Sequence, residues 1–181
     1  RAKIAALPCV PRRRIDTLPA AALLFERVVA RLRPARVVFS ALGLREGLLF
    51  AGLESAELVQ DPLILGATDL DSQRSRAAGI GAALADWTAP LFPTESEAEA
   101  RLRIAACHVS DVGWLEAPGS LARDAFFMLV HYPFISVDHP GRVTIAATVL
   151  TRYEGVADDR ALRPMLALLG DGERARVQTL G

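Results

Sequence analysis

Few residues in this 181-residue sequence have the types and spacing that metal or nucleophilic chemistry requires. The histidines His108, His131 and His139 are 23 and 8 residues apart, which matches neither HExxH nor a zinc-knuckle pattern. Cys9 and Cys107 stand outside any CxxC pair, so we expect two reduced thiols and no disulfide. No serine lies in a G-x-S-x-G turn, and no glycine cluster could cradle a phosphate. The sequence therefore predicts no metal site, nucleophilic triad or phosphate loop.

Charge is the more informative signal. Arginine supplies 20 of the 21 basic residues, and its planar guanidinium suits bidentate contacts to anions. Residues 1–52 hold ten basic and three acidic side chains, whereas residues 53–181 hold eleven and eighteen. This split predicts two units with different partners.

Composition excludes several classes of protein. About half of the residues are apolar and the formal net charge is zero, which argues against a disordered tail and a general nucleic-acid binder. No apolar run approaches the roughly 20 residues of a membrane span. The first residues lack the order of a signal peptide, so we expect a cytoplasmic protein without a membrane partner.

The first part of the chain reads as helix, strand, turn and helix. A helix is predicted over 20–32, with Thr17 as its N-cap and Pro34 after its end. Residues 36–40, Arg-Val-Val-Phe-Ser, have the pattern of a buried strand. A short helix over 44–50 follows. This order resembles the closing unit of an α/β domain.

The rest of the chain reads as helical. Residues 56–70 are poorly periodic and are interpreted as a linker between domains at 1–55 and 71–181. Trp87, Trp114 and the Phe126–Met128 run are expected in the core. Helices are predicted over 74–87, from a Thr94 cap to about 109, over 120–130, over 140–153, over 160–169 with Asp158 or Asp159 as cap, and over 173–180.

Several motifs resemble those of one enzyme family. Residues 40–49, SALGLREGLL, resemble the S-x-x-G-L-R-E-G-x-L signature of the exopolyphosphatase/guanosine pentaphosphatase (Ppx/GppA) family. The blocks at 14–23, 105–114, 152–153 and 173–176 resemble further motifs of that family in the same order. The resemblance covers nearly the whole chain.

The resemblance implies a mostly α fold in two parts. Residues 1–55 would be the C-terminal βα tail of an actin-like (ribonuclease H-like) α/β domain. Residues 71–181 would form an HD-like all-α domain that is incomplete at its C-terminus. The whole enzyme would remove terminal phosphoryl groups from polyphosphate or guanosine pentaphosphate, with Mg²⁺ and a general-base glutamate in an earlier portion. The first residue is Arg rather than Met, which fits a piece of a longer chain.

Two arginines are the candidate substrate contacts. The family places a basic side chain at the Arg14 position facing the cleft, whereas Arg12 and Arg13 are expected in solvent. Arg45 either lies near the cleft or pairs with Glu46 to fix a helix start. No catalytic residue is expected within these 181 residues.

The HD-like part departs from a working HD metal site. Such a site uses an H…HD…D set, in which imidazoles and a carboxylate hold a divalent metal. Here Ser110 stands at the histidine position before Asp111, Asp124 falls in the H-S-x-Y element, and Glu154 replaces the histidine of R-Y-H. We therefore expect no metal at these positions, and expect Asp111 to accept hydrogen bonds within the bundle.

Three functions remain open from the sequence. The first is the C-terminal region of an exopolyphosphatase, which would bind polyphosphate or guanosine penta- or tetraphosphate and form a homodimer. The alternatives are a degenerate HD-type nucleotide-binding regulatory domain and a purely structural dimerisation domain.

Overall fold

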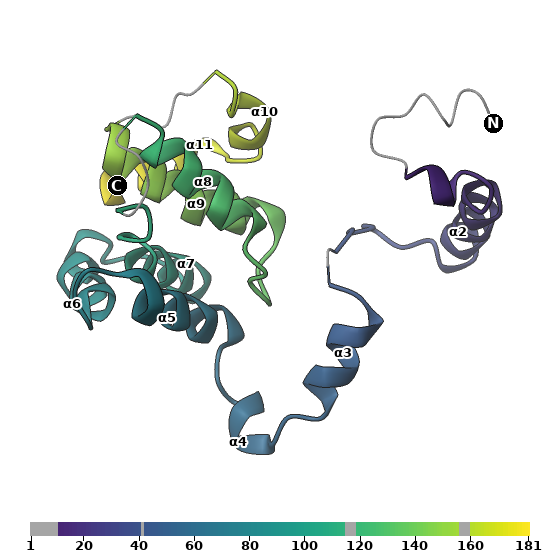
Figure 1. The fold of residues 1–181 in the computed structure, drawn as a ribbon, viewed down its shortest axis with the longest axis horizontal. Helices are drawn as coiled ribbons and strands as arrows, with labels where there is room; N and C mark the ends of the chain where they lie inside the picture. The colour runs from purple at the N-terminus through teal and green to yellow at the C-terminus, as the bar shows by residue number, and fades with distance from the viewer. Residues whose placement is uncertain (1–10, 41, 115–118, 156–159) are drawn as a thin grey trace. The chain divides into compact units, whose positions relative to one another are not determined.

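A computed structural model describes residues 11–40, 42–114, 119–155 and 160–181. The chain divides into two units, Arg1–Gly43 and Leu44–Gly181, and each is considered by itself. Helices dominate both units, and no strand occurs in the described residues (Figure 1). The predicted mostly α fold is confirmed for this part of the chain.

The first unit contains a 3-10 turn, η1 (Arg12–Arg14), and one long helix, α2 (Leu18–Leu32). The helix ends where Arg33 adopts a left-handed conformation before Pro34, as the proline predicts. Thr17 occupies the N-cap position without capping, because its hydroxyl donates instead to the Arg14 carbonyl at 3.2 Å.

The predicted strand over residues 36–40 is wrong. These residues form neither strand nor helix, and Val38 and Phe39 are 60% and 76% exposed. A strand is stable only beside a second strand that shares its backbone hydrogen bonds, and the described residues supply none. The β-branched run therefore has the side-chain pattern of a strand, but no strand forms among the described residues.

The second unit begins with α3 (Leu44–Ala51), which confirms the predicted short helix, and α4 (Ser55–Leu58). The next helix, α5 (Pro62–Arg74), occupies much of the predicted linker, which is a correction. Asp61 caps this helix by accepting from the Leu63 amide at 2.9 Å. The apolar residues of this segment are weakly periodic, so the sequence did not indicate the buried face that Leu63, Ala67 and Leu70 form.

The predicted helix over 74–87 is broken in the structure. The chain leaves α5 at Ser75, and α6 (Ile80–Thr88) starts after Gly79, whose φ of 78° favours glycine. The short 3-10 turn η2 (Ala89–Leu91) follows. The break has a tertiary cause, because the Arg76 amide donates to the distant Asp111 carboxylate at 3.0 Å.

Helix α7 (Glu97–His108) starts two residues later than predicted. Its N-cap is Ser96, not Thr94, and a capping box joins Ser96 to Glu99. Both Thr94 and Ser96 precede acidic residues, so the sequence pattern alone did not distinguish them.

The helix α9 (His139–Glu154) is the centre of this unit, and α7, α8 (Leu121–His131), α10 (Arg163–Leu166) and α11 (Asp171–Leu180) all pack against it. This helix confirms the one predicted over 140–153, and its residues 145–151 are buried without interruption, so it lies in the interior of the unit. Asp138 caps it and Gly155 ends it at a φ of 77°. The proposed caps Asp158 and Asp159 lie outside the described residues, as does Cys9.

The core is built mainly from aliphatic side chains, together with Phe126 and Phe134. The expectation that both tryptophans lie in the core is wrong, since Trp87 is 73% and Trp114 41% exposed. Cys107 is a free, buried thiol, and burial raises its pKa. Among the helices described, none is long and apolar enough to cross a membrane.

At Gly81, helix α6 lies tightly against the end of α7. A Cβ at this position would lie 2.5 Å from the His108 Cα and 2.6 Å from an Asp71 carboxylate oxygen. Only a residue without a side chain allows this packing.

We predict that Gly81→Ala destabilises the helical unit by about 2 kcal/mol, because the new methyl group overpacks against backbone. Gly172→Ala in α11 is the control, since a Cβ added there would meet no atom within 4 Å. Urea unfolding measures both variants. Equal stabilities for the two would show that α6 can shift without cost.

Candidate functional site

A fully buried carboxylate, Asp111, lies in the turn after α7. It accepts three hydrogen bonds from the Arg76 guanidinium, at 2.7 to 3.1 Å, and one from the Arg76 backbone amide. The Arg152 guanidinium, from the last turn of α9, approaches to 3.6 Å. Hydrogen bonding by Arg76 is the main reason that the pKa of Asp111 lies below its usual value, against the opposing effect of burial.

A second buried pair lies beside the first. His108, the last residue of α7, places Nδ1 3.0 Å from an Asp71 carboxylate oxygen. Ser75 donates to the other oxygen of Asp71. Both members of the Asp71–His108 pair are largely buried, so the pair joins the end of α5 to the end of α7.

Two buried hydroxyl groups near this cluster have no hydrogen-bond partner in the described part of the chain. They belong to Ser110, at the HD histidine position, and to Tyr153, in the last turn of α9. Burial raises the pKa of Tyr153. Unpartnered buried hydroxyls are uncommon in native proteins, and they mark this corner as a place where water or a ligand can bind.

The remaining HD positions do not join the cluster. Asp124 on α8 and Glu154 at the end of α9 are both exposed. Within the described ranges, no three His, Cys, Asp or Glu side chains converge on a possible metal position. The two carboxylate oxygens of Asp111 accept four hydrogen bonds, all of them from Arg76. The expected hydrogen bonds to Asp111 are present, and Arg76 supplies them.

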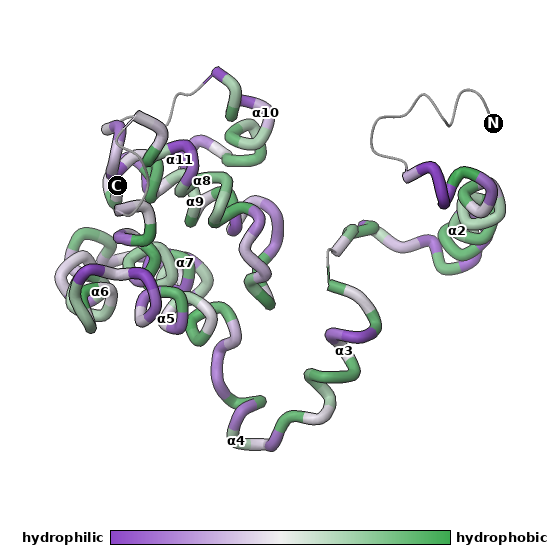
Figure 2. Tube along the Cα trace, in the orientation of Figure 1, coloured by the Kyte–Doolittle hydropathy of each residue, from purple (hydrophilic) through white to green (hydrophobic). Residues whose placement is uncertain are grey.

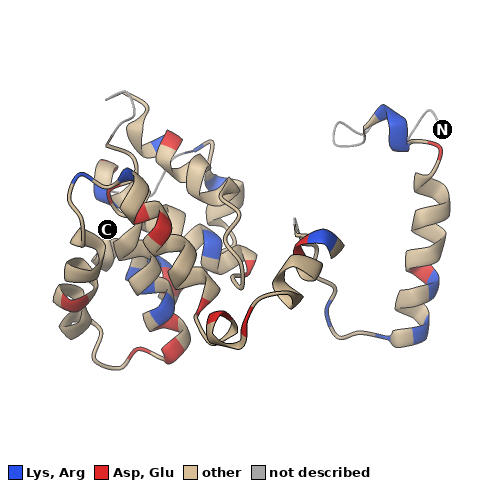
Figure 3. Ribbon diagram, turned by 60° about the horizontal axis from the view of Figure 1, so that its bottom comes forward, with Lys and Arg blue, Asp and Glu red and all other residues tan. Residues whose placement is uncertain are grey.

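Arg14 and Arg45 belong to different units. Arg14 ends η1 and Arg45 is the second residue of α3, and both side chains are exposed. Figure 3 shows the η1 arginines as one continuous basic segment. That Arg14 and Arg45 both contact the same substrate remains a prediction.

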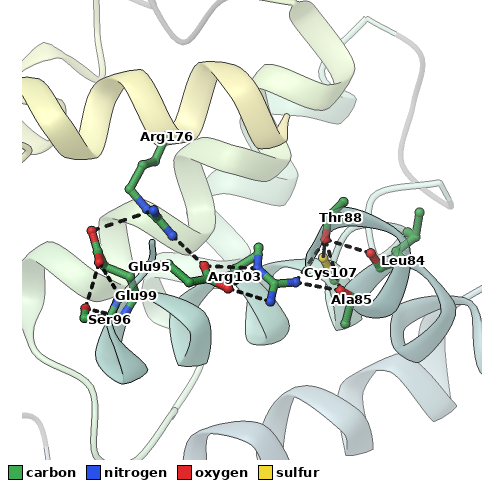
Figure 4. A network of polar contacts seen from close by, with 9 residues as sticks. All are labelled: Leu84, Ala85, Thr88, Glu95, Ser96, Glu99, Arg103, Cys107 and Arg176. Carbon is green, nitrogen blue, oxygen red and sulfur yellow. Dashed lines mark hydrogen bonds and ion pairs between the residues drawn. The ribbon is translucent and has the colours of Figure 1, made fainter. Parts of the chain in front are cut away.

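Another charged network holds the C-terminal helix (Figure 4). Glu95, in the loop before α7, pairs with buried Arg103 of α7 at 2.7 Å and with Arg176 of α11 at 2.8 Å. Arg103 also donates to the Thr88 hydroxyl at 3.1 Å, and Arg176 covers the Phe92 ring at 4.6 Å. Hydrogen bonds from Arg103 are the first cause of a lowered pKa for Glu95.

The sequence did not identify Arg76, Arg103 and Glu95 as members of these networks. Arg76 and Asp111 are 35 residues apart, and no local spacing links them. Arg103 gave a usable signal, since it is a charged residue among apolar positions of a helix and such residues are buried only when paired.

We predict that Asp111→Asn lowers the free energy of unfolding by about 3 kcal/mol at pH 7, because charged hydrogen bonds to a buried group are lost. The pKa of Asp111 is lower in the folded than in the unfolded state, where it is near 3.8. Its ionised form therefore stabilises the fold above that pH, and this contribution disappears as the pH falls through the folded pKa. Urea unfolding between pH 7 and pH 3 measures the difference between wild type and variant.

The exposed Asp124→Asn variant is the control and should change stability by less than about 0.5 kcal/mol. A loss at Asp111→Asn that stays constant down to pH 3 would contradict the ionic account.

For the second network, Glu95→Gln should cost about 3 kcal/mol, since it leaves buried Arg103 without its carboxylate. Amide hydrogen exchange in α11 should also accelerate, because Arg176 loses its partner in the loop. Glu97→Gln, in the exposed first turn of α7, is the matched control. Unchanged exchange in α11 after Glu95→Gln would show that apolar packing alone holds this helix.

A known protein family matches this helical unit. The family model described as exopolyphosphatase, C-terminal, matches residues 63–181, from the first turn of α5 to the end of α11. None of the curated proteins compared with the chain matches it. The matched region contains both charged networks and the whole buried core. The chain belongs to the exopolyphosphatase family, whose C-terminal domain it carries.

Proposed function

We propose that this chain is the C-terminal region of an enzyme that hydrolyses terminal phosphoryl groups of polyphosphate or guanosine pentaphosphate. The single observation that carries the proposal is the family match over residues 63–181. In this proposal the region binds the polyanionic substrate and forms the homodimer, and the phosphate-binding loops and the general base belong to the preceding domains.

Exposed arginines support substrate binding. Arg14 ends η1 and Arg45 lies in the first turn of α3, and both side chains are exposed. Guanidinium groups make bidentate contacts to phosphate oxygens, which suits a polyanionic substrate. The excess of basic residues in this part of the sequence has the sign that such a substrate requires.

Exposed apolar side chains support docking and assembly. In the first unit, Leu24 and Leu32 of α2 are 63% and 71% exposed, and Figure 2 shows green segments along this helix. In this proposal another part of the whole enzyme covers these side chains. Leu65, Leu91 and Leu168 of the helical unit are also exposed and are candidates for the dimer contact.

The proposed enzyme uses Mg²⁺, and the bound ion would neutralise negative charge on the phosphate. Among the described residues no three His, Cys, Asp or Glu side chains converge on a possible metal position, and the carboxylates of Asp71, Asp111 and Glu95 each pair with protein partners. We therefore assign the ion to the preceding domains and derive no step through it here.

Titration calorimetry separates this proposal from the two alternatives. The chain is titrated with polyphosphate and, separately, with guanosine tetraphosphate. Polyphosphate binding is expected. Binding of the nucleotide alone would instead identify a degenerate HD-type regulatory domain, and binding of neither would leave a structural dimerisation domain. A phosphate-release assay should show no hydrolysis by the 181-residue chain itself.

We predict that Arg14→Ala in the whole enzyme lowers kcat/KM for polyphosphate by about ten- to a hundredfold, mainly through KM. A charged contact to phosphate contributes about 1.5–3 kcal/mol, which corresponds to that range. The effect should shrink at high salt, which screens attraction to a polyanion.

Arg12→Ala, in the same turn, is the control and should have a much smaller effect. Equal, small losses for both variants would show that η1 is only a solvated charged surface. A large loss for Arg14→Ala together with a lower melting temperature would indicate a structural role instead.

A further inference from the structure

A hydrogen bond to sulfur joins α5 to α8. The guanidinium of Arg74, the last residue of α5, donates from Nη1 to the Sδ of Met128 in α8 at 3.3 Å. Met128 is half-buried and packs against the edge of the apolar core. A thioether sulfur is a weak acceptor, so this bond contributes little in the reduced protein. The contact nevertheless places a cation from 54 residues away directly beside a methionine sulfur.

The backbone at Arg74 is fixed independently of this contact. The Trp114 indole N–H donates to the Arg74 carbonyl oxygen, and the Ser75 amide donates to the Asp71 carbonyl at 2.9 Å to close the last turn of α5. The fold therefore positions the guanidinium near the sulfur, and the weak bond to sulfur is not what holds it there.

Oxidation changes what this sulfur can accept. In the reaction with hydrogen peroxide, a sulfur lone pair attacks one peroxide oxygen, the S–O bond forms and the O–O bond breaks. The second oxygen takes the proton from the first and leaves as water. The thioether is thereby oxidised to a sulfoxide and the peroxide is reduced. The sulfoxide is polar, and in an apolar environment it usually disrupts packing.

We propose that Met128 is a site of methionine oxidation at which the Arg74 guanidinium binds the sulfoxide oxygen. The sulfur already lies 3.3 Å from Nη1, so an oxygen bonded to it is within hydrogen-bond reach of the guanidinium. A hydrogen bond from a charged donor is about twice as strong as a neutral one. Oxidation at this position therefore strengthens the link between α5 and α8 and leaves the core intact.

Met165 of α10 is the other methionine of the sequence and supplies an internal control. It is also half-buried and packs against the core. In the described part of the chain, no hydrogen bond to its sulfur is present. A sulfoxide there would lose water without gaining a charged partner, so oxidation of Met165 should destabilise the helical unit.

Urea unfolding before and after treatment with hydrogen peroxide tests the proposal. Met165→Leu leaves Met128 as the one methionine of the chain, and Met128→Leu leaves Met165. Peptide mass spectrometry verifies that each remaining methionine has gained one oxygen. Oxidation should leave the urea midpoint of Met165→Leu unchanged or higher, and should lower that of Met128→Leu by at least about 0.5 M.

A second substitution in the Met165→Leu background identifies the partner. With Arg74→Ala, oxidation of Met128 should lower the urea midpoint by at least about 0.5 M. Arg123→Gln, at an exposed arginine of α8, is the matched control and should not change the response to oxidation. Each comparison is made within one variant, so the packing that the substitution removes cancels. Where Arg74→Ala does not unfold cooperatively, Arg74→Gln replaces it and should show about half the loss, because it keeps a neutral donor.

Three results would overturn the proposal. The first is a Met128 that stays unoxidised while free methionine in the same solution reacts. The second is a lower midpoint for oxidised Met165→Leu. The third is an Arg74→Ala variant that tolerates oxidation of Met128 as well as the parent does, which would show that the guanidinium does not bind the sulfoxide.

Discussion

The helical domain depends on one buried carboxylate. Removing Asp111 from water costs several kcal/mol unless hydrogen bonds replace the lost hydration. Four bonds from Arg76 do so, and they fix the connection between α5 and α6 against the turn that follows α7. Arg152 adds a second positive charge from α9. The carboxylate of Asp111 thus connects three segments that are distant in sequence. The neighbouring Asp71–His108 pair likewise joins two helix ends through a buried carboxylate.

This constraint explains how a buried carboxylate can serve packing. Asp111 uses its lone pairs for hydrogen bonds from Arg76, which join the turn after α7 to the connection between α5 and α6. The second network, built on Glu95 and Arg103, fixes α11 in the same way. In the function proposed above, the helical domain contributes a rigid shape and a surface, and the bond-breaking chemistry belongs to the preceding domains.

The sequence predicted elements whose signals are local. The helix α9 has a capping aspartate at one end and a glycine at the other, and α3 and α11 were also located. The break between α5 and α6 was missed because it depends on the bond from the Arg76 amide to Asp111. The strand over 36–40 was predicted from side-chain pattern, but pairing is a property of two segments. At the site, Asp111 was expected to accept hydrogen bonds, yet its partner could not be identified before the fold brought the two residues together.

The most direct test of the account is a double-mutant cycle between Arg76 and Asp111. Free energies of unfolding are measured at neutral pH for wild type, Arg76→Gln, Asp111→Asn and the double variant. If the ion pair organises this corner, the double variant should be hardly less stable than Asp111→Asn alone, with a coupling energy of at least about 1.5 kcal/mol. Losses that add to within about 0.5 kcal/mol would contradict the central role of this pair.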